Sequence, residues 1–235
     1  MTQKLPYTTE KITQLSDTVY QVILNPPEDN AISYMAGQYV LVSNHTGEAR
    51  PYSIANAPLG GQHIELHIRH TEKNIFTKHL LQDIDDDKPI YLEGAFGHCY
   101  MDCVPDNPLI FMAGGTGFSQ SKALIETVIN AKPNTNMHLF WVARMPADLY
   151  LASLAKLWQQ QLPHFTFTPI VSNDNESWQG CAERIEHAVV LAYPDLKNKI
   201  IYASGAQEMV FTALHYFEQH GLLREHMLSD AFDFK

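Results

Sequence analysis

Residues 109–120, LIFMAGGTGFSQ, decide the fold class of this chain. The first five residues are apolar and predict a buried strand, and three glycines follow within four positions. Residues 118–131 then carry apolar side chains at helical spacing. A strand, a glycine-rich turn and a helix in this order are typical of the ligand-binding edge of an open α/β sheet.

The glycine-rich turn is a candidate anion site, formed by Gly114, Gly115, Thr116 and Gly117. Glycines allow the backbone to approach a pyrophosphate, and the free N–H groups and dipole of the following helix favour a negative charge. Gln120 stands where the dinucleotide fingerprint has its third glycine, and no acidic residue follows the second predicted strand. By spacing alone, a dinucleotide site and a simple tight turn are equal alternatives.

The C-terminal half continues the alternation of strand and helix, which predicts a Rossmann-like parallel sheet wound with helices. A segment rich in proline and acidic residues at 102–108 is the expected linker, so we expect domains at 1–104 and 105–235. The predicted strands are 109–113, 137–143, 165–171 and 200–203, and the predicted helices are 118–131, 147–160, 184–192 and 207–220.

The N-terminal half consists of short β-like runs separated by turn residues, which predicts an antiparallel six-stranded β-barrel. One short helix is expected at 75–81, and the acidic residues 85–87 after it are expected to form a solvated turn. The clearest β-like runs are 10–16, 19–24, 37–43, 64–69 and 90–94.

A second candidate site lies in this half, at Arg50-Pro51-Tyr52-Ser53. An arginine suits a phosphate or a polyol, a tyrosine offers a flat face, and a serine hydroxyl can bond to a ring nitrogen. Taken alone, the segment is better explained as a surface arginine on a strand with a tyrosine in the core behind it.

The two segments together, in this order, resemble the ferredoxin-NADP reductase superfamily. Within it the chain resembles the short bacterial NAD(P)H:flavin reductases, including those that supply reduced flavin to luciferase. Further landmarks of the resemblance fall at residues 36–39, 64–68, 178–180, 204–209 and 229–232.

The resemblance implies a flavin-binding barrel, an NAD(P)-binding C-terminal domain and a set of site residues. Ser53 would be the catalytic contact at the edge of the flavin that accepts hydride, and Arg50 would hold the polar tail of the flavin. Gly205 would admit the nicotinamide, and Arg144 would lie near the adenosine end. The implied cofactor-binding residues are Arg50, Pro51, Tyr52, Ser53, His67, Ile68, Gly114, Gly115, Thr116, Gly117, Arg144, Gly205, Asp230 and Phe232.

Two departures from the family pattern affect the expected flavin chemistry. Residues 73–77, KNIFT, stand where many relatives begin a helix with Gly-x-x-Ser, which grips the second phosphate of FAD. Ser204 stands where many relatives have cysteine. The first departure predicts that riboflavin, FMN or FAD binds as a dissociable substrate.

The implied activity is NAD(P)H-dependent reduction of free flavin, with the reduced flavin released to a flavin-consuming monooxygenase or luciferase. Two alternatives remain open: a reductase with resident FAD that serves an iron–sulfur protein or an oxygenase, and a dinucleotide-binding module without activity. The sequence does not choose between NADH and NADPH.

Composition excludes several other classes. A formal net charge of −10 disfavours nucleic acid and anionic membranes as partners. No apolar run approaches the length of a membrane span and the N-terminus is polar, so we expect a cytoplasmic protein. Cys99, Cys103 and Cys181 form no CxxC pair, and the histidines lack ligand spacing, so neither a disulfide framework nor a metal site is expected.

Overall fold

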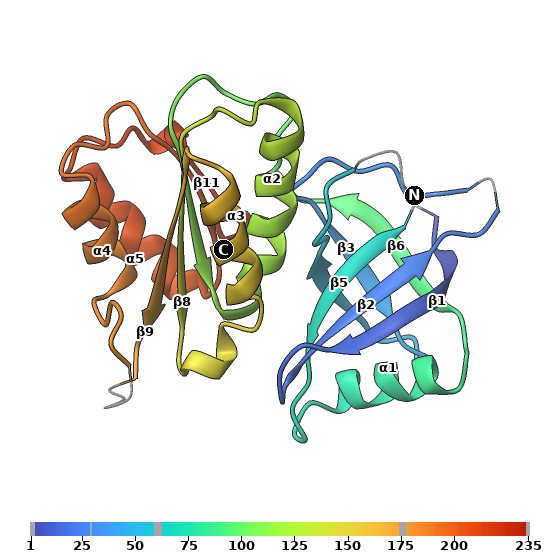
Figure 1. Ribbon diagram of the computed structural model, residues 1–235. Coiled ribbons are helices and arrows are strands. Elements are labelled where there is room, and N and C mark those ends of the chain that lie inside the picture. Colours follow the sequence, from blue (N-terminus) through green and yellow to red (C-terminus); the bar gives the residue numbers. More distant parts are fainter. Residues whose placement is uncertain (1–2, 29, 59–62, 174–177, 234–235) are drawn as a thin grey trace.

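The computed structural model describes residues 3–28, 30–58, 63–173 and 178–233. The chain forms two domains that lie side by side, an N-terminal β-domain and a C-terminal α/β domain (Figure 1). Among the described residues, no helix is both long enough and apolar enough to span a membrane.

The N-terminal domain is a curled antiparallel sheet with strand order β4-β3-β6-β1-β2-β5. An isolated antiparallel bridge between Ile54 and Leu66 joins its two edges, which makes the sheet a barrel. The elements are β1 (Leu5–Gln14), β2 (Val19–Asn25), β3 (Tyr39–Ser43), β4 (Ala49–Ser53), β5 (Ile64–Arg69), α1 (Ile75–Asp85) and β6 (Ile90–Phe96).

The barrel is filled by alternate apolar residues of its strands, as the two-residue period of a strand requires. Helix α1 lies below the strands in Figure 1 and contributes Phe76, Leu80 and Ile84 to the same core. The helix continues to Asp85, beyond the expected end at residue 81, because Ile84 is also buried there. The acidic residues after it are exposed, as expected.

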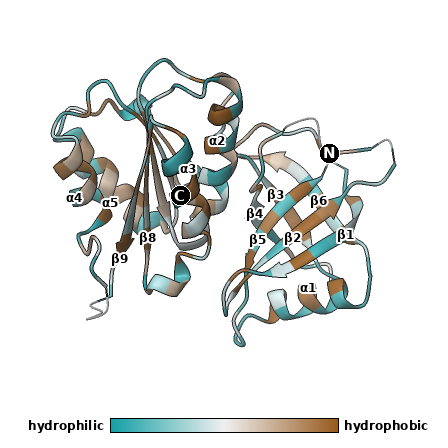
Figure 2. Ribbon diagram, in the orientation of Figure 1, coloured by the Kyte–Doolittle hydropathy of each residue, from teal (hydrophilic) through white to brown (hydrophobic). Residues whose placement is uncertain are grey.

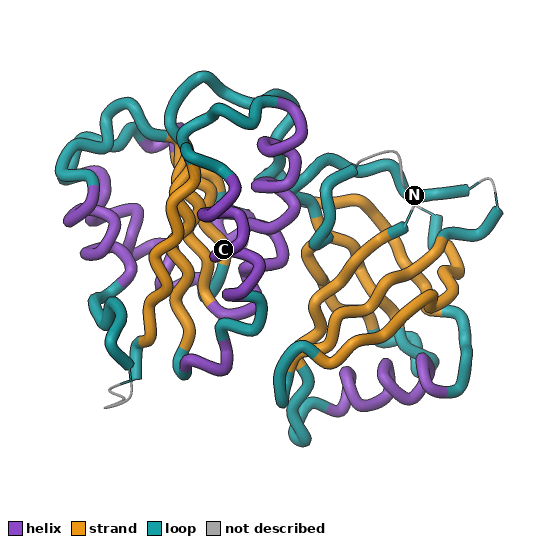
Figure 3. Tube along the Cα trace, viewed as in Figure 1, coloured by secondary structure: helices purple, strands orange, loops and turns teal. Residues whose placement is uncertain are grey.

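The C-terminal domain is a parallel sheet with strand order β11-β10-β7-β8-β9. Helices α2 and α3 cover one face and α4 and α5 the other (Figure 3). Figure 2 shows the sheet as mainly hydrophobic between these layers. The elements are β7 (Leu109–Gly114), α2 (Phe118–Ala131), β8 (Met137–Ala143), α3 (Ala152–Gln161), β9 (Phe165–Val171), α4 (Ile185–Ala192), β10 (Ile200–Ser204), α5 (Gln207–Glu218) and β11 (Met227–Leu228).

The order of the strands alone indicates where a ligand would bind, namely at the carboxyl ends of β7 and β10. From β7 the chain adds β8 and β9 on one side, then returns to add β10 on the other side of β7. Open α/β sheets bind ligands at such a switch point, at the carboxyl ends of the strands. The glycine-rich turn follows β7 and Gly205 follows β10, so both lie at this edge.

The structure also differs from the expected elements elsewhere in the chain. The expected helix 147–160 is divided into a 3₁₀ turn at Pro146–Asp148 and α3, because Leu149 and Tyr150 turn inward between them. Strand β1 begins at Leu5, where pairing with β6 extends it beyond the expected run 10–16. Strands β4 and β11 were not among the expected runs.

Candidate active site

A cleft of about 580 Å³ lies between the two domains. Ligand sites of this size, ~300–1,000 Å³, are usual for small molecules and cofactors. The barrel lines it with Pro51, Tyr52, Ser53, His67 and Arg69, the turn and α2 with Gly114, Thr116, Gly117, Ser119 and Gln120, and the end of β10 and the C-terminal segment with residues 203–207 and 229–231.

The barrel side of the cleft offers a flat aromatic face and a hydroxyl. The Tyr52 ring packs on Phe76 of α1, with ring centroids 6.3 Å apart and planes 23° from parallel. Burial raises the pKa of Tyr52 to about 12, so its phenol stays neutral at neutral pH. Among the residues that the structure describes, none is hydrogen-bonded to the Ser53 hydroxyl, which leaves it available to a ligand.

The opposite side of the cleft is the glycine-rich turn, a 3₁₀ turn at Gly115–Gly117 between β7 and α2. Gly115 has φ +54°, in the left-handed region that favours glycine. A Cβ atom on Gly117 would lie 2.5 Å from the carbonyl oxygen of Ser204, so no side chain fits there. The Ser204 hydroxyl donates to the Gly117 carbonyl at 2.7 Å, which explains how serine serves at this position.

Gln120, the departure from the dinucleotide fingerprint, has a structural reason. Its side-chain amide donates to the Gly37 carbonyl in the barrel and, at 2.8 Å, to the Asp230 carboxylate in the C-terminal segment. Asp230 also accepts from the Cys99 backbone N–H at 3.1 Å. Burial raises the pKa of Asp230, and these donors counteract the rise. A glycine at residue 120 could not make these contacts between domains.

A second hollow of about 540 Å³ continues from the cleft across the α/β domain. Arg69, Gly114, Thr116 and Ala206 line both hollows, so the two form one continuous track. Arg144, directly after β8, lines this second hollow. Two ion pairs also line it: Arg69 with Asp148 at 4.0 Å, and Arg184 with Glu186 at 2.6 Å.

Arg50 lies outside the cleft, in a third hollow that the start of α1 also lines. Its guanidinium donates to the Glu48 carboxylate through Nε, at 3.0 Å, and through Nη2. The side chain of Asn74 caps α1 and accepts from the Thr77 backbone N–H at 3.2 Å. Arg50 and one backbone N–H at the start of α1, two groups that could bind a phosphate here, therefore already have partners within the protein.

Two other expected residues lie apart from the cleft. Ile68 is buried in the barrel core. Phe232 packs edge-on against Phe211, with the Arg224 guanidinium 3.8 Å from its ring centroid. Their cofactor-binding roles stay predictions. The sequence reasoning missed Arg69, although it lies two residues after His67 on a predicted strand and so faces the same way.

The residues present fit a flavin and a nicotinamide dinucleotide. The barrel offers an aromatic face and a free hydroxyl, and across the cleft a helix begins at a glycine turn whose backbone can approach a phosphate. The fold and the cleft together define a two-domain oxidoreductase of the kind that joins a flavin-binding barrel to a nicotinamide-binding domain.

Comparison with known families agrees with this class. The model of the oxidoreductase FAD-binding domain matches residues 6–100, and that of the oxidoreductase NAD-binding domain matches residues 111–214. The chain belongs to the ferredoxin-NADP reductase family.

Relatives within the family carry the names of different reductases. The CDP-6-deoxy-L-threo-D-glycero-4-hexulose-3-dehydrase reductase of Yersinia pestis is 34% identical over 97% of this chain and 68% of its own length. The NAD(P)H-flavin reductase of Vibrio harveyi is 28% identical over 96% of this chain and 97% of its own length. A solved ferredoxin reductase of carbazole 1,9a-dioxygenase has the same fold, with a TM-score of 0.85 at 22% identity, covering 98% of this chain and 69% of its own.

Proposed function

We propose that the chain uses NAD(P)H to reduce free flavin, namely riboflavin, FMN or FAD, and releases the reduced flavin to a separate acceptor such as a monooxygenase or a luciferase. The cofactors supply the hydride chemistry when bound. The similarity to the Vibrio harveyi NAD(P)H-flavin reductase, 28% identity over 96% of this chain, supports this choice.

The roles of the protein groups follow from where they lie. Tyr52 offers its face to a flat ring, and the Ser53 hydroxyl can donate to or accept from a ring nitrogen. The backbone of the turn at Gly115–Gly117 and the start of α2 favour a pyrophosphate. Because hydride transfer between a bound nicotinamide and a bound flavin would need no strong acid or base, the task of these residues would be to orient the two rings.

The observation that carries the proposal is the state of the phosphate-binding groups near α1. Glu48 forms an ion pair with Arg50, and the Asn74 side chain occupies one N–H of the helix start. Each charge-assisted hydrogen bond that a flavin phosphate fails to make weakens binding by about 1.5–3 kcal/mol. A few such losses move a nanomolar complex into the micromolar range, where flavin exchanges during turnover.

The test is the absorbance spectrum of the purified protein, followed by NAD(P)H oxidation with and without added flavin. We expect a nearly colourless protein whose rate rises from near zero and saturates as riboflavin or FMN is added. A yellow protein that keeps one equivalent of flavin through gel filtration, and that does not respond to added flavin, would contradict the proposal.

The second candidate is a reductase with resident FAD that passes electrons to a protein partner. The 34% identical dehydrase reductase of Yersinia pestis, of which this chain spans about two thirds, favours it. A Glu48→Gln variant helps to separate the two functions because it frees Arg50 for a phosphate. We expect this variant to bind FAD more tightly than the wild type and riboflavin, which has no phosphate, equally well.

A further inference from the structure

Strand β5 turns one face to the barrel core and the other to the α/β domain. Ile64, Leu66 and Ile68 point into the core, whereas the residues between them, Glu65 and His67, contact residues of the α/β domain. Buried polar side chains require hydrogen-bond partners, whereas apolar residues would cover such an interface without them. The polar face of β5 therefore needs an explanation.

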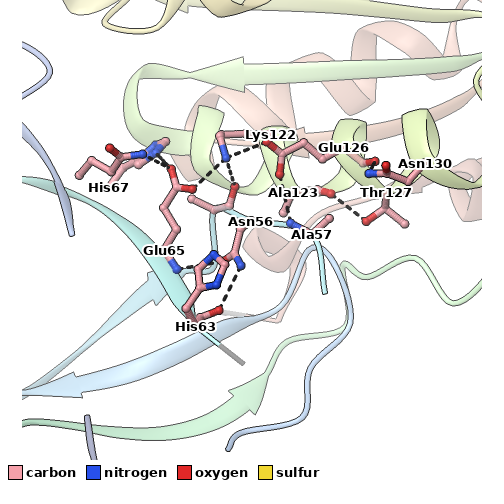
Figure 4. Close-up of polar contacts among 12 residues, drawn as sticks. Asn56, Ala57, His63, Glu65, His67, Lys122, Ala123, Glu126, Thr127 and Asn130 are labelled. Atoms are coloured by element: carbon pink, nitrogen blue, oxygen red, sulfur yellow. Dashed lines mark hydrogen bonds and ion pairs between the residues drawn. The ribbon is translucent and has the colours of Figure 1, made fainter. Parts of the chain in front are cut away.

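Lys122 of α2 enters the barrel side of this interface (Figure 4). Its ammonium group has three N–H donors and three acceptors: the Ala55 carbonyl at 3.0 Å, Glu65 Oε2 at 3.0 Å and Glu126 Oε1 at 2.8 Å. Two of the acceptors belong to the barrel and the third belongs to α2. Only 8% of the lysine side chain is exposed, so solvent screens these bonds weakly.

The other oxygen of Glu65 extends the network toward the cleft. Oε1 accepts from Gln21 Nε2 at 2.8 Å and lies 2.8 Å from His67 Nε2. Burial raises the pKa of Glu65, but the hydrogen bond to His67 and the charge of Lys122 outweigh burial and lower the pKa to about 2. Glu65 is therefore a carboxylate that only accepts, so His67 Nε2 carries a proton and donates.

The second nitrogen of His67 returns the network to the α/β domain. Burial lowers the pKa of His67, so the ring is neutral and Nδ1 accepts from the Tyr150 hydroxyl at 2.9 Å. The Tyr150 ring packs edge-on against Trp141, whose indole N–H donates to the Gly115 carbonyl at 2.9 Å. A series of hydrogen bonds and one ring contact thus runs from Lys122 of the α/β domain through Glu65 and His67 of the barrel and back to the glycine-rich turn.

We propose that Lys122 is a positioning residue, which holds the flavin side of the cleft against the nicotinamide side at the separation that hydride transfer needs. The inference rests on the proposed transfer of hydride between bound nicotinamide and flavin. Directional hydrogen bonds fix the sideways position of one domain on the other, whereas a smooth apolar contact allows sliding. A displacement of about 1 Å at the reacting atoms can lower the rate about a hundredfold.

The decisive variant is Lys122→Met, which keeps the length of the side chain and removes its charge and donors. We expect kcat to fall about tenfold to a hundredfold, while KM for NAD(P)H and for flavin and the affinity for NAD(P)⁺ by calorimetry stay nearly unchanged. The primary isotope effect with deuterated NAD(P)H should rise because hydride transfer becomes slower than the other steps. Lys122→Arg keeps the charge and several donors, so it should recover most of kcat.

The matched control is Lys88→Met, which removes a lysine that is also ion-paired, to Asp83 and Asp86, but within the barrel and away from the interface. We expect this variant to keep the wild-type kcat and isotope effect. A Lys122→Met enzyme with wild-type kcat and isotope effect would overturn the proposal.

A double variant, Lys122→Met with Glu65→Gln, separates positioning from stability. Removing one member of a buried ion pair is strongly destabilising, whereas replacing both members is often tolerated. We therefore expect the melting temperature to recover in the double variant while kcat stays low. Recovery of kcat together with the melting temperature would show that Lys122 only stabilises the fold, and the proposal would be wrong.

Failure of the proposed function can be distinguished from failure of this inference. If the wild type retains flavin and does not reduce added flavin, the proposed function fails. The same variants are then compared by single-turnover reduction of the retained flavin, followed by its absorbance. A slow Lys122→Met reaction with unchanged nucleotide affinity would still support positioning, and a wild-type rate would refute it.

Discussion

The buried carboxylate of Glu65 makes stability depend on pH. Its pKa falls from the ordinary value of 4.5 to about 2, because the hydrogen bond to His67 and the charge of Lys122 outweigh the opposing effect of burial. A carboxyl with a lower pKa in the folded chain binds protons less readily there than in the unfolded chain. Its contribution to stability is therefore complete above about pH 4.5 and is lost as the pH falls toward 2.

The size of this contribution follows from the two pKa values. At about 1.36 kcal/mol per pKa unit, the difference corresponds to on the order of 3 kcal/mol in the free energy of unfolding. From the linkage between proton binding and folding, we expect about 2 kcal/mol of this contribution to be lost between neutral pH and about pH 3. Glu65→Gln keeps the shape of the side chain and removes its titration. The stability gap between wild type and variant should therefore be widest at neutral pH and narrow by about 2 kcal/mol toward pH 3.

Urea unfolding followed by tryptophan fluorescence, repeated from neutral pH to about pH 3, measures this gap. Glu218→Gln, on the exposed surface of α5, is the control, and its gap from the wild type should not change with pH. A gap for Glu65→Gln that stays constant or widens as the pH falls would refute the reasoning, because it would mean that folding does not lower the pKa of this carboxyl.

Three further substitutions test the cleft. Ser53→Ala should lower kcat by about tenfold to a hundredfold, because the loss of one polar contact costs about 1–3 kcal/mol, and KM for NAD(P)H should change little. A variant with wild-type turnover would remove Ser53 from the mechanism. Gly115→Val strains a residue at φ +54° and should raise KM for NAD(P)H far more than KM for flavin, whereas equal effects would argue against separate half-sites. Gly117→Ala brings a Cβ to 2.5 Å from the Ser204 carbonyl oxygen and should destabilise the fold by about 1–3 kcal/mol; an unchanged melting temperature would contradict this.

Much of the fold is predictable from local patterns. The expected helix 118–131 and the expected strands 137–143 and 165–171 coincide with α2, β8 and β9. Burial on one face of a helix leaves a periodic signal in the sequence itself, and burial on both faces of a parallel strand leaves an apolar run. Strands β4 and β11 leave no clear hydrophobic pattern in the sequence, because β4 is largely exposed and β11 has only two residues.

The candidate site was predictable only where its residues lie in one segment. Tyr52 and Ser53, and the turn around Thr116, carry their chemistry within a few residues of each other, and the structure brings both segments to one cleft. Arg50 belongs to the same motif as Ser53, yet it lines a different hollow. Strand direction alone does not say which neighbours a side chain meets, so the separation of Arg50 from the cleft required the structure.

The sequence by itself therefore determined the two classes of domain, their order and the two motifs that face the cleft, because each rests on contacts or periods within a short stretch. Only the tertiary structure decided how the domains meet. Glu65 and Lys122 are 57 residues apart, and neither shares a sequence motif with the other. Their pairing depends on the curl of one sheet and the placement of a helix on another, and no local pattern in the chain encodes that geometry.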